Sequence, residues 1–216
     1  MRQLSTLEAM ASDREDALMM HRRWYSANSK ESETNMELPT VIELDIIICF
    51  DRISHKSIKD ILISPSGAKL GIFRCLKAGI NPNFPEQGTP QGGVASPLLA
   101  NVALNGIEDI HQSIRYADDM IFFLKPQDDA DKVLNKVSLF LSERGMEISK
   151  EKTKVTATTD GFDFLGWQFK VQKNGKFRST PSKENFETMR EKVKTIVNNS
   201  NYGAEVKASK LAPIIR

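Results

Sequence analysis

Short apolar runs and amphipathic stretches follow one another along this chain. Runs rich in β-branched and aromatic residues predict strands, and apolar residues spaced by three and four positions predict helices. The resulting elements are a helix over 1–26, an exposed loop over 27–38, a strand over 41–49, helices over 54–62, 68–78, 96–110 and 128–144, a strand pair over 162–172, and a helix over 181–199. This mixture predicts an α+β fold, a small antiparallel sheet with helices packed on one face.

Two adjacent aspartates interrupt the apolar stretch from Arg115 to Phe123. An apolar run, the pair Asp118 and Asp119, and a second apolar run predict two strands joined by a tight turn with the acids at its tip. Such a pair is often just a solvated turn. It also suits Mg²⁺, which prefers hard oxygen ligands and commonly shares one or two carboxylates with substrate phosphates.

A third carboxylate, Asp45, stands inside the β-branched run 41–49. A lone carboxylate in a buried strand is costly unless it is paired or binds a metal. Asp45 is therefore a candidate partner for the two aspartates of the turn.

The composition describes an ordinary globular protein, with 40% hydrophobic and 27% charged residues. The net charge of +2 hides an asymmetry, because residues 1–144 hold 16 Lys and Arg against 20 Asp and Glu, whereas residues 145–216 hold 14 against 8. A basic second part is expected of a surface that follows a phosphate backbone, although solvated helix faces produce the same asymmetry. No apolar run is long enough for a membrane span.

The two cysteines and the N-terminus bear on the compartment. Cys49 and Cys75 fall within apolar patterns, which favours reduced core residues over a disulfide or a metal pair. The first residues lack the basic start and apolar stretch of a secretory signal. We therefore expect an intracellular protein, in a bacterial cytoplasm or the interior of an organelle, and not a secreted one.

Four stretches, in this order, resemble the palm motifs of reverse transcriptases. They are Val41–Asp51, Gln87–Asn101, Arg115–Phe123 and Phe164–Phe169. The second, which contains Gln-Gly-Thr-Pro-Gln-Gly-Gly, is similar to the group II intron reverse transcriptases and maturases. The resemblance covers roughly residues 41 to 185.

The resemblance implies a role for each matching residue. Asp45, Asp118 and Asp119 would hold two Mg²⁺ ions, or Mn²⁺ in their place, one activating a primer 3′-hydroxyl and the other steadying a triphosphate. Lys152, with Lys154 as the alternative, would lie near the nucleotide phosphates. The nucleotide-binding residues implied are Phe50, which would exclude a 2′-hydroxyl, with Gln91, Gly92 and Tyr116. The primer grip implied is Leu165, Gly166 and Trp167.

The chain also departs from the family pattern. Motifs that grip template and nucleotide are mostly absent before Asp45, and Ile47 and Ile48 replace a basic and a small residue. The apolar pair suggests tighter packing or relaxed selection on catalysis. The expected organisation is an N-terminal helix and loop over 1–40, a palm over 41–180 and the start of a helical thumb over 181–216.

Three functions remain open from the sequence. The first is an RNA-directed DNA polymerase that uses an RNA template, a DNA primer and deoxynucleotides. The second is a non-catalytic RNA-binding intron maturase, and the third is an inactive truncated remnant. Whether a second polypeptide supplies missing fingers or thumb also remains open.

Overall fold

The computed structural model describes residues 40–77, 85–90, 95–172, 174 and 176–215. The helix and loop expected within residues 1–38 lie outside this part of the chain, as do Gln91 and Gly92. The first half contains β1 (Thr40–Leu44), α3 (Cys49–Arg52), α4 (His55–Ile61), α5 (Ser66–Lys77), α6 (Ser96–Leu104), the short 3₁₀ helix η1 (Ile107–Asp109), β2 (Ser113–Tyr116) and β3 (Asp119–Leu124). The second half contains α7 (Ala130–Ser142), β4 (Lys154–Ala157), β5 (Phe162–Phe164), β6 (Trp167–Val171), β7 (Phe177–Pro181), α8 (Lys183–Val197) and α9 (Ala204–Ile215).

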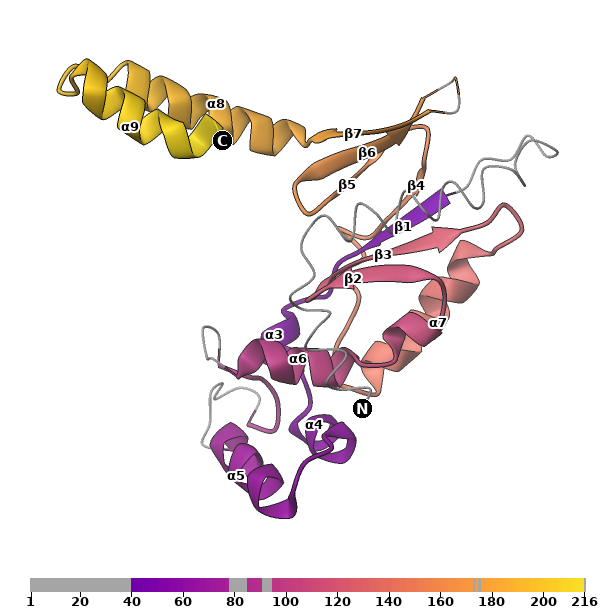
Figure 1. Ribbon diagram of the computed structural model, residues 1–216. Helices are drawn as coiled ribbons and strands as arrows, with labels where there is room; N and C mark the ends of the chain where they lie inside the picture. The colour runs from indigo at the N-terminus through magenta and orange to yellow at the C-terminus, as the bar shows by residue number, and fades with distance from the viewer. Residues whose placement is uncertain (1–39, 78–84, 91–94, 173, 175, 216) are drawn as a thin grey trace.

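The strands form two antiparallel sheets (Figure 1). The larger sheet has the order β2-β3-β1-β4, and the smaller one has the order β5-β6-β7. The predicted α+β fold is confirmed, but the strands beyond 162 form a sheet of their own.

Strand alternation separates the larger sheet into two apolar faces. On one face, side chains such as Leu44 and Phe122 pack with residues of α4, α6 and α7 into the main core. On the other face, Ile121 and Phe123 pack with aromatic residues of the smaller sheet. The helices thus cover one face of the larger sheet, as predicted, and the smaller sheet packs against the other.

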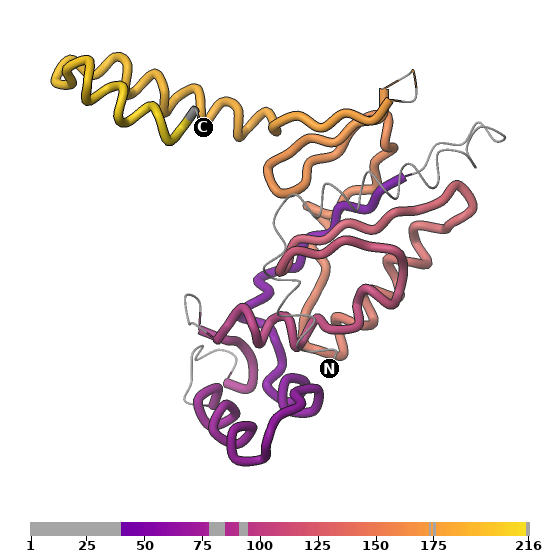
Figure 2. Tube along the Cα trace, in the orientation of Figure 1, coloured from indigo at the N-terminus to yellow at the C-terminus, as the bar shows by residue number. Residues whose placement is uncertain are grey.

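Helices α8 and α9 form a hairpin that extends away from both sheets, as the tube shows clearly (Figure 2). Ser182 caps α8 by accepting a hydrogen bond from the Asn185 backbone N–H, which confirms the predicted start of this helix. No residue of α8 is buried. Its apolar side chains, such as Phe186 and Met189, remain 49% and 42% exposed. This hairpin lies in the part of the chain that was expected to begin a helical thumb.

The strand expected over 41–49 ends at Leu44. The chain then turns, leaving Ile47 39% and Ile48 58% exposed, so the expected tight packing of this pair is wrong. Ile48 has φ 45° and ψ 51° at the start of α3. A β-branched residue in the left-handed region is strained, at a cost of about 1–2 kcal/mol. Only glycine, which lacks a Cβ, would avoid that strain.

Another boundary differs from prediction. The helix expected over 96–110 ends at Leu104, because Gly106 adopts φ 95° and the chain continues as η1. Ala95 holds the N-cap position of α6 and makes no side-chain hydrogen bond there. The Ser96 hydroxyl donates a 2.5 Å hydrogen bond to the Pro90 carbonyl.

In the part of the chain that the structure describes, no helix combines the length and apolar character needed to cross a membrane.

Candidate active site

The register of the larger sheet brings Asp45 to the turn that carries the other two aspartates. Leu44, the last residue of β1, pairs with Met120 in β3, so Asp45 follows at the level where β3 begins with Asp119. Tyr116 pairs with Asp119 across the β2–β3 hairpin, which leaves Ala117 and Asp118 as the turn. The predicted hairpin with the acids at its tip is confirmed.

The three carboxylates lie in one region of negative potential. Partial burial raises the pKa of Asp119, and the charges of Asp118 and Asp45 raise it further, while Lys152 opposes them. Asp118 also contributes, after burial, to raising the pKa of the Cys49 thiol to about 12. The charges of Asp118 and Asp45 therefore make Asp119 harder to ionise, which is the condition that a bound cation relieves.

Lys152 already provides one positive charge at this site. Its Nζ lies 3.0 Å from Asp45 Oδ2, and its side chain is 74% exposed. The hydrogen bond to Asp45 and the charge of that carboxylate raise the pKa of Lys152.

The Lys152 segment is held beside Asp45 by its backbone. The Ser149 N–H donates to the Asp45 carbonyl at 2.9 Å, and the Ile47 N–H donates to the Glu147 carbonyl at 2.9 Å. These contacts bring residues about a hundred positions apart in sequence together just beyond the C-terminal end of β1. The structure thus brings Lys152 to Asp45, whereas Lys154 lies within β4.

The donor chemistry fits a divalent cation. Among the described residues, no group of three or more His, Cys, Asp or Glu side chains could hold a metal ion. Mg²⁺ usually takes only one or two carboxylates and completes its shell with water and substrate phosphates. Asp45, Asp118 and Asp119 supply the right ligand type, without forming an all-protein cage.

Phe50 lies in α3 and packs, half-buried, against the main core. Its carbonyl accepts a 2.7 Å hydrogen bond from the Thr89 N–H. The Gly88 carbonyl is 2.7 Å from His55 Nε2. The Gly-Thr-Pro segment is thereby fastened to the helices that follow Asp45. Tyr116, at the end of β2, is 48% exposed.

The three proposed primer-grip residues form the β5–β6 turn and its exit. Leu165 has φ 50° and Gly166 has φ 77°, and Trp167 begins β6. The Gly166 carbonyl accepts hydrogen bonds from the Ser182 N–H at 2.9 Å and from Asn185 Nδ2 at 3.0 Å. A Cβ on Gly166 would overlap the Asn185 amide, so this turn and the start of α8 form one tightly packed unit.

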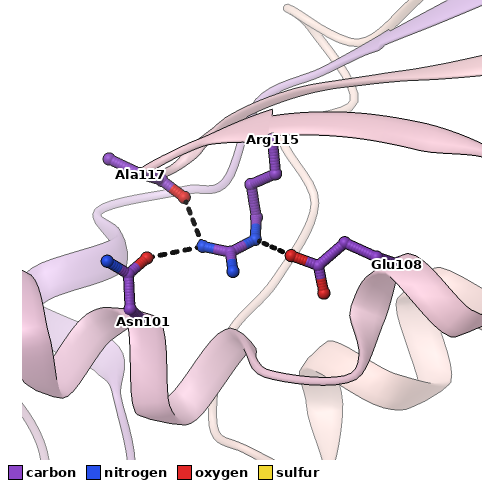
Figure 3. A network of polar contacts seen from close by, with 4 residues as sticks. All are labelled: Asn101, Glu108, Arg115 and Ala117. Atoms are coloured by element: carbon purple, nitrogen blue, oxygen red, sulfur yellow. Dashed lines mark hydrogen bonds and ion pairs between the residues drawn. The ribbon is translucent and has the colours of Figure 1, made fainter. Parts of the chain in front are cut away.

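Sequence reasoning assigned no role to Arg115. Its guanidinium bridges Glu108, Asn101 and the Ala117 carbonyl, as the close-up shows (Figure 3). The sequence signal that could have identified Arg115 is the alternation of inward and outward side chains along the strands of the β2–β3 hairpin. Arg115 pairs with Met120, which is 2% exposed in the main core, so a charged side chain had to lie on the inward face and needed partners.

Comparison with known proteins agrees with the resemblance to reverse transcriptases. A family described as "Reverse transcriptase (RNA-dependent DNA polymerase)" matches residues 3–169. "Maturase-like protein 1" of Euglena gracilis is 41% identical over 179 residues, covering 82% of this chain and 39% of the relative. "Group II intron-encoded protein LtrA" of Lactococcus lactis subsp. cremoris is 26% identical, covering 62% of this chain and 35% of the relative. The chain therefore spans about two fifths of the length of these curated relatives.

Solved structures support the fold. Apo telomerase from Candida tropicalis superposes with a TM-score of 0.60 at 12% identity, covering 94% of this chain and 44% of that one. Telomerase from Candida albicans, in complex with a fragment of telomeric RNA, gives a TM-score of 0.56 at 16% identity, covering 99% and 45%. At these identities the similarity is one of fold.

Proposed function

Because the chain belongs to the reverse transcriptase family, of the group II intron and maturase type, we propose that it is an RNA-directed DNA polymerase. Its substrates are an RNA template, a DNA primer and deoxynucleotide triphosphates. Since the chain spans about two fifths of its relatives, this activity is proposed from the site and not transferred from the relatives.

The observation that carries the proposal is the common electrostatic field of the three aspartates. Asp118 and Asp45 both raise the pKa of Asp119, and the sheet register brings Asp45 to the level of the turn that carries the other two acids, which supports a shared cation. We assign Asp45, Asp118 and Asp119 as the residues that hold Mg²⁺, two ions during the reaction, with Mn²⁺ able to replace it. Bound Mg²⁺ would lower the pKa of the primer 3′-hydroxyl and offset the charge of the leaving pyrophosphate.

The remaining site residues bind and orient the substrates. Lys152, whose side chain is 74% exposed despite its contact with Asp45, reaches the phosphates of the incoming nucleotide. From the resemblance to the family, we assign Phe50 to the exclusion of a 2′-hydroxyl, and Tyr116, Gln91 and Gly92 to the binding of the incoming nucleotide. Leu165, Gly166 and Trp167 hold the primer end. Hydrogen bonds from the start of α8 to the Gly166 carbonyl fix the turn that these residues form.

We also propose that the chain consists of three segments. Residues 41–180 are the palm, residues 181–216 begin the thumb, and residues 1–40 are an N-terminal segment that the family match enters at residue 3. The excess of 14 Lys and Arg over 8 Asp and Glu in residues 145–216 provides the surface for nucleic-acid phosphates. A second polypeptide that completes the fingers or thumb is compatible with this arrangement.

A maturase that binds intron RNA without polymerising is the second candidate. It is favoured by the 41% identity to a protein named maturase-like and by the strained backbone of Ile48, three residues after Asp45 in the sequence. An inactive remnant of either kind is the third.

RNA-templated primer extension by the purified full chain separates these candidates. A polymerase extends the primer with Mg²⁺, loses the activity in chelator and regains it when the metal is restored. A chain that binds RNA and supports splicing, yet extends no primer with either Mg²⁺ or Mn²⁺, is the maturase. A chain that does neither is the remnant.

Lys152→Met should separate nucleotide handling from metal binding. Because the Lys152 ammonium occupies an Asp45 oxygen at 3.0 Å, its removal should tighten Mn²⁺ binding without nucleotide by about two- to fivefold, the coupling range of an exposed ion pair. Primer extension should nevertheless slow, since a positive charge near the triphosphate is lost. Electron paramagnetic resonance of Mn²⁺ and extension rates measure the two effects. Lys150→Met, an exposed lysine of the same segment, is the control, and equal behaviour of both variants would refute the role.

A further inference from the structure

We propose that Arg115 is a positioning residue that sets the geometry of the turn carrying Asp118 and Asp119. This inference rests on the proposed function, because it assigns Arg115 a role toward the metal that these carboxylates hold. Arg115 itself touches neither substrate nor metal, and acts through the backbone of the turn.

The guanidinium joins the turn to two helical elements. Its Nε donates to Glu108 Oε1 at 2.6 Å, and Nη1 donates to Asn101 Oδ1 at 2.6 Å and to the Ala117 carbonyl at 3.2 Å. Asn101 lies on α6 and is 3% exposed, while Glu108 lies on η1. Figure 3 shows the guanidinium between these two helical elements and the hairpin turn. The turn is therefore tied to parts of the main core.

The turn requires this support. Ala117 adopts φ 55°, a left-handed conformation that a residue with a Cβ disfavours. The two carboxylates that follow repel each other, which opposes a compact turn. The hydrogen bond from Arg115 fixes the Ala117 carbonyl, so the turn can be held without a bound cation. A fixed carbonyl orients the next peptide, and thereby the direction in which the Asp118 side chain leaves the backbone.

Only an arginine can make this set of contacts. Its planar fork presents several donors in fixed directions, whereas a lysine ammonium is a point charge on a flexible stem. The Arg115 side chain is 8% exposed, so the fork is held rigidly by its surroundings. Arg115 and Asp118 also act in opposite directions on the pKa of the same thiol, Cys49, which agrees with their proximity.

A Mn²⁺ titration followed by electron paramagnetic resonance tests the inference on the full chain. The Arg115→Met variant should bind Mn²⁺ about tenfold more weakly, within the 10–100-fold range that loss of an outer-shell partner causes. A higher Mg²⁺ concentration should restore much of the primer-extension rate that Arg115→Met loses. The Mg²⁺ concentration that gives half-maximal activity should therefore rise by a larger factor than the factor by which kcat falls. The Arg115→Lys variant should recover the thermal stability of the wild type but only part of its metal affinity.

Arg144→Met is the matched control. Arg144 is likewise a shielded arginine, with a side chain 17% exposed and an Nη1 that donates to the Phe140 carbonyl at 2.9 Å, but it lies just beyond the end of α7. Its loss should lower the melting temperature and leave Mn²⁺ affinity unchanged. A purely structural role for Arg115 would give the same pattern.

Wild-type metal affinity in the folded fraction of both Arg115 variants would therefore overturn the inference. If Arg115→Met fails to fold, Arg115→Lys and Glu108→Gln decide the matter by the same titration. If the wild type shows no Mn²⁺ binding that Asp118→Asn removes, the proposed function itself fails and this inference falls with it. If Asp118→Asn removes binding but the Arg115 variants do not weaken it, only the positioning role is refuted.

Discussion

The Asp118→Ala variant should lose RNA-templated primer extension by on the order of 10³-fold or more, beyond the 10–100-fold effect of changing an outer-shell partner. The substitution removes a carboxylate of the proposed metal site and leaves the basic residues that follow it in place. Asp118 is only partly buried in its turn, so the fold should survive. Extension rates with saturating Mg²⁺ and equal RNA occupancy measure the effect.

RNA affinity should respond differently from activity. Binding through several phosphates falls steeply with salt but depends little on one acidic side chain. We expect the RNA affinity of Asp118→Ala to equal or slightly exceed that of the wild type, because a negative charge beside the nucleic acid is removed. Asp60→Ala, an exposed acid of α4, is the control and should change neither quantity. Equal extension by Asp118→Ala and the wild type would contradict the assignment.

The Phe50→Ala variant should incorporate ribonucleotides, with discrimination against them reduced by about 10–100-fold, the range that steric exclusion of a small group supplies. The ring fills the space that a 2′-hydroxyl needs if Phe50 lies under the sugar. The measurement is the ratio of kcat/KM for deoxynucleotides and ribonucleotides on the same primer and template.

Stability must be separated from selectivity in this variant. Phe50 packs half-buried against the main core, so the truncation should also lower the free energy of unfolding, by less than the ~3–5 kcal/mol of a fully buried Phe. Phe140→Ala is the matched control, because Phe140 packs half-buried on the same core from α7. Its stability should fall and its nucleotide preference should not change. If Phe50→Ala retains the wild-type preference, Phe50 is only a core residue.

The elements that local sequence determines could be predicted. The β2–β3 hairpin follows from two apolar runs around a polar pair, and the starts of α4 and α8 follow from Ser54 and Ser182, whose side chains accept hydrogen bonds at the helix N-termini. Packing of helices against the larger sheet follows from its apolar strands and the amphipathic helices that accompany them.

Other features depend on contacts that no local pattern contains. The apolar character of Ile47 and Ile48 favoured continuation of the strand. After Leu44, however, the backbone of Asp45 and Ile47 forms hydrogen bonds with the 147–149 segment. The division into two sheets also depends on long-range packing, because Phe162 and Phe169 cover a face of the larger sheet that the sequence left unassigned.

The candidate site was predicted in part. Asp45, Asp118 and Asp119 were singled out by chemistry and resemblance, and the sheet register brings their positions together. The ion pair of Lys152 with Asp45 required the fold, since the two residues are far apart in sequence. The contacts of Arg115 required it as well, because they join two helical elements to a turn.

The most direct test of the account is a crystal structure of the chain with Mn²⁺, primer, template and a non-hydrolysable nucleotide, with Mn²⁺ located by anomalous scattering. We expect an ion bound by both Asp45 and Asp118, with metal–oxygen distances near the ~2.1 Å of Mg²⁺, and with nucleotide phosphates completing its shell. Asp45 and Asp118 side chains directed to opposite faces of the sheet, or an ion bound elsewhere, would contradict it.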